Sequence, residues 1–453
     1  MLKDKKVLVV GMGRSGIAAA EEALRAGARV TVQDSKKPED IDDSLKAFLE
    51  KNNIEGIFGR TPDEGSDYDM LILSPGVPPG LDFIKEARDK GAEIIGELEL
   101  AYRLSHGKFV AITGTNGKTT TTTLVGEIYK AAGFKTHVAG NIGVAVVREA
   151  ARAGEDEILV TETSSFQLET VSRFRPVVSA ILNLTPDHLD RHGDMEGYGR
   201  AKAAIFRNQT EEDFCIINRD DELLWNMVEK IGCNACVVPF SRLTEPEFGA
   251  FVREGRITVK TPQGEEHDIC GADELRIPGS HNLENALAAA AITFFGGVEP
   301  DVIGKVLREF SGVEHRIEMC GEVDGVRFVN DSKGTNTDAA AKAIEAMKEN
   351  IILIAGGYDK GADFDEFAAG FEGPVKGLVL MGKTADKLKA SAEKAGFRNI
   401  TMCANMEECV AKAFEQAEKG DVVLLSPACA SWDMYNSFEE RGEHFKKCVR
   451  QLQ

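Results

Sequence analysis

Short runs of aliphatic and β-branched residues alternate with longer amphipathic segments along the 453 residues of the chain. This rhythm is typical of strands followed by helices, and it restarts twice. The first block predicts strands at residues 6–10, 29–34 and 69–76, with an alanine-rich helix at 17–28. The second predicts strands at 108–114, 157–163 and 177–185, and the third predicts strands at 326–331, 351–357, 377–382 and 421–427.

Fully apolar strands separated by helices indicate parallel sheets that are covered on both faces. We therefore expect an α/β protein of three domains, a number that also suits the length of the chain. The predicted domains are a Rossmann-like domain at 1–97, a central P-loop ATPase-type domain with a mostly parallel sheet at 98–312, and a Rossmann-like domain at 313–453. Residues 240–269 instead alternate as antiparallel hairpins do.

Composition narrows the class of protein. A net charge of -20 argues against a nucleic-acid partner, because phosphate-backbone binders carry basic faces. No apolar run is long enough to cross a bilayer, so no membrane insertion is expected. Nine cysteines without a secretory signal predict reduced thiols in a cytoplasmic protein. The only CxxC pair, Cys233 and Cys236, lacks a second pair and is interpreted as two half-buried structural thiols.

In the first block, Gly11, Gly13 and Gly16 follow a strand and open a helix, and Asp34 ends the next strand. This matches a dinucleotide fingerprint, in which glycines let the backbone approach a pyrophosphate at a helix N-terminus. A nucleotide diphosphate or NAD would fit these residues, and a plain strand–helix turn is the alternative. The LSPG segment that ends at Gly76 closes a neighbouring strand.

The second block contains the segment AITGTNGKTTTTT at residues 111–123. It resembles a P-loop that lacks the first glycine, since position 112 is isoleucine. Gly114, Gly117 and Lys118 would converge with the helix dipole on the phosphates of ATP, and Thr119 would ligate Mg²⁺. The threonine run is a poor helix former, so a local compensation is expected.

Further polar residues follow neighbouring strands of the second block. Glu162 could face the same magnesium ion, and His188 lies beyond the next strand. Helix capping is the favoured interpretation of Asp187. Asn282 and Asn285 share one helix face, where they would either contact adenine or cap the helix.

Strand-end loops of the third block bring together two cations, two hydroxyl groups and a carboxylate, a set suited to a small polycarboxylate. They are Asp331, Lys333, Thr335, Lys360 and Ser431. Arg316 precedes them and could reach a phosphate. Taken singly, each of these residues is more simply explained as a solvated surface residue.

The segments TGTNGKT, ETSSFQLE, NLTPDHLDRH, HNLENA and NDSKGTN resemble the Mur ligase family of peptidoglycan synthesis. The segments SPACASWDMYNSFEERG and GGYDKGADF are similar to those of its D-glutamate-adding members, and a signature associated with addition of a diamino acid is absent. The resemblance implies ATP-dependent addition of D-glutamate to UDP-N-acetylmuramoyl-L-alanine through an acyl phosphate. It also implies two magnesium ions, and we expect a monomer.

The resemblance implies five sets of site residues. ATP would be bound by Gly114, Thr115, Asn116, Gly117, Lys118, Thr119, Thr120, Asn282, Asn285, Arg316 and Asp331. The UDP substrate would be bound by Arg14, Ser15, Asp34, Ser35, Gly76, Asn141 and His188, which displaces NAD. D-Glutamate would be bound by Thr335, Lys360, Ser431, Trp432 and Phe438. The metal ions would be bound by Thr119, Glu162, His188 and a carbamylated Lys202, and the catalytic residues would be Lys118, Glu162, His188 and Lys202.

Several alternatives remain open at this point. Lys202 could be an ordinary lysine on the surface of a helix. A NAD-dependent oxidoreductase would leave the ATP loop and the third block unexplained. An ATP-binding regulator would release no phosphate, and a ligase for a different amino acid would share most of these motifs.

Overall fold

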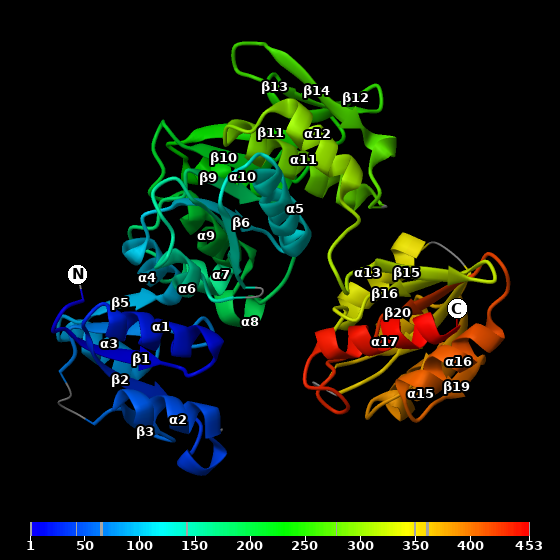
Figure 1. The fold of residues 1–453 in the computed structure, drawn as a ribbon, viewed down its shortest axis with the longest axis horizontal. Coiled ribbons are helices and arrows are strands. Elements are labelled where there is room, and N and C mark those ends of the chain that lie inside the picture. The colour runs from blue at the N-terminus through cyan, green and yellow to red at the C-terminus, as the bar shows by residue number, and fades with distance from the viewer. Residues whose placement is uncertain are drawn as a thin grey trace. The chain divides into compact units, whose positions relative to one another are not determined.

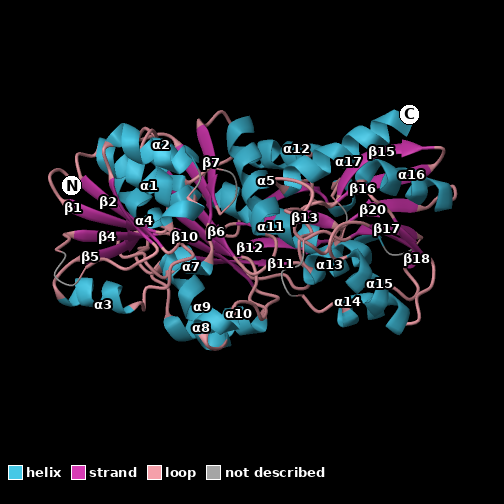
Figure 2. Ribbon diagram, turned by 90° about the horizontal axis from the view of Figure 1, so that it is seen from below, coloured by secondary structure: helices cyan, strands magenta, loops and turns pink. Residues whose placement is uncertain are grey.

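The computed structural model describes residues 2–41, 43–63, 67–141, 144–277, 279–347, 350–358 and 362–452. They form three sheets, each with helices on both faces (Figures 1 and 2). The chain divides into two compact units, Met1–Arg276 with Ser280–Phe310, and Ile277–Gly279 with Ser311–Gln453. The predicted three-domain α/β fold is confirmed, with the first two sheets inside one unit.

The N-terminal sheet is parallel, with the strand order β3-β2-β1-β4-β5. Its strands are β1 (Lys6–Val10), β2 (Arg29–Asp34), β3 (Glu55–Phe58), β4 (Met70–Leu73) and β5 (Glu93–Gly96), and its helices are α1 (Arg14–Arg25), η1 (Pro38–Asp40), α2 (Asp43–Asn52) and α3 (Asp82–Asp89). Alternate residues of β1 enter different cores: Val7 and Val9 join the cluster of α1, whereas Leu8 and Val10 join that of α3. The strand order reverses between β1 and β4, where ligands bind in such sheets.

The central sheet has the order β14-β13-β12-β11-β10-β9-β6-β8-β7. Its strands are β6 (Lys108–Thr113), β7 (Thr136–Gly140), β8 (Ile158–Glu162), β9 (Val178–Ile181), β10 (Phe214–Asn218), β11 (Cys236–Ser241), β12 (Gly249–Arg253), β13 (Arg256–Lys260) and β14 (Glu266–Gly271). The pairs β12–β13 and β13–β14 are antiparallel, as the alternation predicted, and the remaining pairs are parallel.

The helices of this region are α4 (Glu97–Leu104), α5 (Lys118–Ala131), α6 (Val146–Ala150), α7 (Ser165–Leu168), α8 (Leu189–His192), α9 (Met195–Ala203), η2 (Ala204–Phe206), α10 (Glu222–Ile231), η3 (Ala272–Glu274), α11 (Ser280–Phe295) and α12 (Pro300–Glu309). The strand β6 lies between β8 and β9, so the loops after these three strands meet at one edge of the sheet.

The C-terminal sheet has the order β15-β16-β20-β17-β18-β19, with β15 antiparallel. Its strands are β15 (Glu318–Val323), β16 (Val326–Asn330), β17 (Ile351–Ala355), β18 (Val375–Leu380), β19 (Ile400–Met402) and β20 (Val422–Leu425). Its helices are α13 (Thr337–Met347), α14 (Asp365–Ala369), α15 (Ala385–Lys394), α16 (Met406–Gln416) and α17 (Phe438–Leu452). Leu353 packs in one core and its neighbours Ile352 and Ile354 in the other, which explains the continuous apolar strands.

Two buried glutamates of α4 connect the N-terminal sheet to the central one. Glu97 accepts the backbone N–H of Val147, at the start of α6, at 2.7 Å. Glu99 accepts the backbone N–H groups of Ser172, Arg173 and Phe174 and the guanidinium of Arg103. Since the core of α1 continues through α4 to Phe109 and Phe174, the first two sheets share one apolar interior.

Within the described residues, no helix combines the length and the apolar character needed to cross a bilayer.

Burial raises the pKa of Glu97 from 4.5 to about 7, although hydrogen bonds from α6 oppose the shift. The folded state therefore holds a proton that the unfolded state has lost between these two pH values. Stability should fall by about 3 kcal/mol as pH rises from 4.5 to 7 and be unaffected by this group at higher pH. The free energy of unfolding, measured with urea at several pH values, should fall less between pH 4.5 and 7 in Glu97→Gln than in the unaltered protein. The glutamine keeps an acceptor oxygen but cannot titrate. An equal dependence of the unfolding free energy on pH in the two proteins would contradict this effect of burial.

Candidate functional site

The loop after β6 is a compact glycine turn that leads into α5. Gly114 and Gly117 have φ values of 154° and 82°, which favour glycine. Gly117 is the N-cap residue of α5 and, having no side chain, makes no side-chain cap hydrogen bond to the start of the helix. The Lys118 ammonium turns back over the loop and donates to the carbonyl oxygens of Gly114 and Thr115 at 2.8 and 2.7 Å.

The threonine run of α5 is stabilised by side-chain contacts, as expected from its weak helix propensity. Thr119 donates to Glu162 at the end of β8, at 2.9 Å between Oγ1 and Oε2. Thr121 donates to the Asn285 side chain at 3.3 Å, and Thr123 donates to the carbonyl oxygen of Thr119. Three of the five threonines are thus paired with the neighbouring strand, α11 and their own helix, whereas the Thr122 hydroxyl is buried without a hydrogen-bond partner among the described residues.

Glu162 contacts two other predicted site residues, Thr119 and Asn141. Its second carboxylate oxygen accepts the Asn141 amide at 3.0 Å, and it is 2% exposed. A threonine hydroxyl beside a carboxylate is an oxygen donor pair of the kind that magnesium prefers. On α11, Asn282 and Asn285 do share one face, and Asn285 donates to Asn282 at 3.2 Å.

Lys202 is 1% exposed and contacts the same loop. Its ammonium lies 2.9 Å from the Gly114 carbonyl oxygen and 4.5 Å from the centroid of the Tyr198 ring. Burial, reinforced by the nearby Lys118 charge, lowers its pKa from 10.5 to about 6. The interpretation of Lys202 as a surface lysine is therefore wrong, because the side chain is enclosed beneath the phosphate loop.

His188 follows β9 and adopts a left-handed backbone with φ of 52°. It occupies the N-cap position of α8, and its ring is 48% exposed. The interpretation of Asp187 as a helix cap is wrong: α8 has no side-chain cap, and the Asp187 carboxylate instead lies 3.5 Å from His188 Nε2. The left-handed residue between strand and helix turns the chain without a cap.

Sequence analysis missed Asn183, which follows β9. Its side chain accepts the Asn116 N–H at 2.8 Å and donates to the Asn116 carbonyl oxygen at 3.1 Å, which fixes the middle of the phosphate loop. A polar residue at the end of a strand adjacent to β6 was the available signal. The sequence alone does not show that β9 is next to β6, and this adjacency is what places Asn183 beside the loop after β6.

In the N-terminal sheet, the loops after β1 and β4 meet at the reversal point of the strand order. The Ser74 hydroxyl donates to the Gly11 carbonyl oxygen at 2.6 Å. The Asp34 carboxylate accepts the backbone N–H groups of Met12 and Lys36 at 2.6 and 2.9 Å. Asp34 thus holds the glycine turn after β1 in place. Arg14, Ser15, Ser35 and Gly76 lie in or beside the same loops.

The loops that follow β16, β17 and β20 form the C-terminal rim, where D-glutamate binding is predicted. Arg441, which sequence analysis also missed, holds two of these loops together. This buried guanidinium donates to the Ser332 hydroxyl and carbonyl and to the carbonyl oxygens of Cys429 and Ala430. It therefore joins the loops after β16 and β20. Arg441 lies in the first turn of α17, at the end of the SPACASWDMYNSFEERG segment, but nothing in the sequence distinguished it from the charged residues beside it.

The predicted rim residues have different environments. Asp331 accepts the Ser426 hydroxyl at 2.6 Å, and burial raises its pKa to about 7. Ser431 is buried, whereas Trp432 is 62% exposed and lies 5.7 Å from Tyr358 between ring centroids. The ring of Phe438 lies 5.7 Å from the Lys333 ammonium. Thr335 and Arg316 lie in the loops beside them, and Lys360 lies outside the described residues.

One cluster in the described part of the chain has the spacing of a metal site: Glu314, His315 and Glu443. Lys446 forms ion pairs with both glutamates, so an ammonium already contacts the carboxylates that a metal ion would need. Cys233 and Cys236 are free, partly buried thiols.

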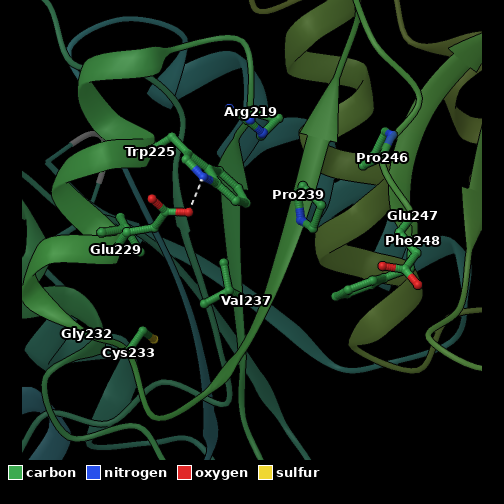
Figure 3. Close-up of a pocket in the computed structure, with 11 residues that line it drawn as sticks. Arg219, Trp225, Glu229, Gly232, Cys233, Val237, Pro239, Pro246, Glu247 and Phe248 are labelled. Atoms are coloured by element: carbon green, nitrogen blue, oxygen red, sulfur yellow. Dashed lines mark hydrogen bonds between the residues drawn. The ribbon is translucent and has the colours of Figure 1, made fainter.

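A pocket of about 530 Å³ lies between α10 and β11 (Figure 3). Trp225 and Phe248 stand on opposite sides of Val237 and Pro239, and the Trp225 indole donates to Glu229. None of the predicted site residues lines it. Val238 and Phe240 alternate with the lining residues of β11 and face the other side of the sheet.

The fold and the loop together define a three-sheet α/β protein built around a P-loop variant. Comparison with known families is consistent with this class. The chain matches the Mur ligase MurD-like N-terminal domain at residues 5–96, the Mur ligase middle domain at 112–293, and the Mur ligase glutamate ligase domain at 315–429.

Curated relatives match from end to end. The chain is 52% identical to the UDP-N-acetylmuramoylalanine–D-glutamate ligase of Alkaliphilus oremlandii and 47% identical to that of Clostridioides difficile, over 100% of this chain and 99% of each relative. A crystal structure of UDP-N-acetylmuramate–alanine ligase from Thermotoga maritima shares the fold, with a TM-score of 0.60 at 20% identity over 99% of this chain and 100% of that one. A pseudomurein peptide ligase type C from Methanothermus fervidus gives a TM-score of 0.57 at 20% identity, with the same coverage. The chain belongs to the Mur ligase family and is a ligase.

A methyl group added at Gly117 would lie 2.2 Å from Asn285 Oδ1, whereas one added at Gly133 would meet nothing within 4 Å. Both residues have φ near 85°, at 82° and 88°. Gly117→Ala and Gly133→Ala should therefore each lose about 1–2 kcal/mol of stability from the backbone. Only Gly117→Ala should also weaken binding of a non-hydrolysable ATP analogue, measured by calorimetry. Equal weakening by both variants would contradict the role of the Gly117–Asn285 contact.

Proposed function

We propose that the chain is an ATP-dependent amide ligase that adds D-glutamate to UDP-N-acetylmuramoyl-L-alanine in cytoplasmic peptidoglycan precursor synthesis. The observation that carries the proposal is the loop at Gly114, where Lys118 and Lys202 converge beside the Thr119–Glu162 pair. Relatives named for this reaction match the whole chain.

The reaction has two steps. An oxygen of the L-alanine carboxylate attacks the γ-phosphorus of ATP, and ADP leaves. The D-glutamate amine then attacks the acyl carbon, inorganic phosphate leaves, and the amine loses a proton as the amide forms. Both steps require positioning of the reactants and stabilisation of negative oxygens.

The loop residues Gly114–Thr120 would hold the phosphates of ATP, with Lys118 neutralising charge as it develops. Asn282 and Asn285 would contact the nucleotide from α11. Arg316 and Asp331 are also proposed to bind ATP. The loops with Arg14, Ser15, Asp34, Ser35 and Gly76 would bind the UDP moiety. Asn141 and His188 would border the muramoyl end of this substrate.

Thr119 and Glu162 fit a magnesium ion, because a hydroxyl and a carboxylate already meet at hydrogen-bond distance. Magnesium would neutralise phosphate charge there. A second ion would be held by His188 and carbamylated Lys202. An uncharged lysine amine can add CO₂ with loss of a proton, which converts it into a carboxylate-like ligand, and enclosure of Lys202 favours the uncharged amine.

Thr335, Lys360, Ser431, Trp432 and Phe438 would bind D-glutamate at the C-terminal rim. The buried Arg441 would keep two of the contributing loops in register. We further propose that the enzyme acts as a monomer.

Phosphate release from ATP tests the reaction. With UDP-N-acetylmuramoyl-L-alanine present, D-glutamate should stimulate release, whereas L-glutamate and L-lysine should not. Lys118→Ala should lower turnover by a factor on the order of 10² or more, while Lys130→Ala, an exposed lysine of the same helix paired with Glu127, serves as the matched control. Stimulation by another amino acid would keep the ligase chemistry and overturn the rim assignment. Phosphate release that does not depend on any amino acid would overturn both the ligase chemistry and the rim assignment.

Carbamylation of Lys202 has a spectroscopic test. Protein equilibrated with ¹³C-bicarbonate should show a carbamate carbonyl signal in its NMR spectrum, and Lys202→Arg should lack it, because a guanidinium does not form a stable carbamate. Removal of CO₂ should lower activity reversibly. The same signal in both proteins would assign the carbamate to a different amine.

A further inference from the structure

The imidazole of His188 packs against the ring of Phe166, the second residue of α7. The two ring centroids are 4.8 Å apart with an angle of 55° between the planes. Because His188 has a left-handed backbone and a ring that is 48% exposed, contacts of its side chain decide where the ring points. Two side chains therefore hold the His188 ring: Phe166 packs against its face, and the Asp187 carboxylate lies 3.5 Å from its Nε2.

Phe166 is in turn held by Arg191, one turn after His188. The Arg191 guanidinium carbon lies 4.9 Å from the centroid of the Phe166 ring, within cation–π range. Its Nη2 and Nε donate to the two carboxylate oxygens of Glu169 at 2.7 and 3.3 Å. A planar guanidinium can make this forked contact and stack on a ring at the same time, which an ammonium cannot do.

Glu169 is also fixed from a second direction. Its Oε1 lies 3.4 Å from Nδ1 of the nearly buried His192, and Nε2 of that ring lies 3.0 Å from the Ser165 hydroxyl. His192 stacks on Phe166 at 5.6 Å with an angle of 26° between the planes. The ring of Phe166 is thus held by α7 and α8 together.

Arg191 reaches the N-terminal sheet as well. Its Nη2 donates to the carbonyl oxygen of Val77 at 3.3 Å. Val77 directly follows the proposed UDP contact Gly76, in the loop after β4. The Arg191 guanidinium therefore contacts the loop after β4, the carboxylate of Glu169 and the Phe166 ring that packs against His188.

We propose that Arg191 is a positioning residue: through Phe166 it sets the orientation of His188, and through the Val77 carbonyl it couples that orientation to the loop after β4. The catalytic consequence rests on the proposed role of His188. The geometric part does not, so the two can be tested separately.

NMR of the histidine rings tests the geometry. The chain has 8 histidines, and His188→Gln identifies the signal of interest. The ring current of Phe166 should displace that signal, so Phe166→Leu should remove the displacement and Phe166→Tyr should keep it. Arg191→Ala should shift or broaden the signal. Arg200→Ala, which removes an exposed arginine paired with Glu196 on α9, is the control and should leave it unchanged.

Steady-state kinetics test the consequence. Arg191→Ala should lower kcat by about 10–100-fold, since a small misplacement of a reacting group has costs of this size. It should raise KM for the UDP-muramoyl substrate and leave KM for ATP within about twofold, because the phosphate loop lies on other elements. Arg191→Lys should recover only part of kcat. Adding Glu169→Gln to Arg191→Ala should cause little further loss, as expected for residues of one network.

An unmoved His188 signal in Arg191→Ala would overturn the proposal, whatever the activity. A displaced signal with unchanged kcat would support the positioning by Arg191 and overturn the catalytic role of His188. If Arg191→Ala fails to fold, Arg191→Lys and Phe166→Leu provide the same comparison. A His188 signal that stays in place in both would likewise overturn the proposal.

Discussion

The carbonyl oxygen of Gly114 accepts hydrogen bonds from both Lys118 and Lys202, and the organisation of the central domain follows from this contact. Two amines that share one acceptor disfavour each other's charge, and burial disfavours the charge of Lys202 further. Two amines beside the N-terminus of α5 place positive charge where the helix dipole also favours an anion. The left-handed glycines are required because a side chain at Gly117 would displace Asn285.

The N-terminal and central sheets form a single unit because polar groups connect them inside a shared apolar core. Glu97 and Glu99 each satisfy backbone N–H groups of the central domain, and Arg191 reaches back to the loop after β4. A buried carboxylate that satisfies several N–H groups tolerates little displacement, since each unpaired group would cost free energy. The loops proposed to bind the UDP substrate therefore have a defined position relative to the phosphate loop.

The C-terminal unit obtains the same rigidity from a buried cation. Arg441 donates to carbonyl oxygens of two strand-end loops. Because Gly357 has no side chain, its backbone can lie close to the guanidinium: a Cβ there would be 3.2 Å from Arg441 Nη1. A guanidinium that is enclosed in this way must have its N–H groups paired, so the loops are held to one arrangement. An amino-acid site built on them would be formed before its ligand arrives.

The sequence by itself determined the strand–helix alternation and the three sheets, and it predicted the phosphate loop. Apolar periodicity, glycine position and the order of motifs are local properties, and they identified Lys118, Thr119 and Glu162 correctly as neighbours. Tertiary structure alone decided that Lys202 is enclosed, that Asp187 does not cap α8, and that Asn183 and Arg441 brace the loops. These properties depend on which strands are adjacent and which side chains lose water. Both are set by packing between distant segments, and no spacing along the chain records them.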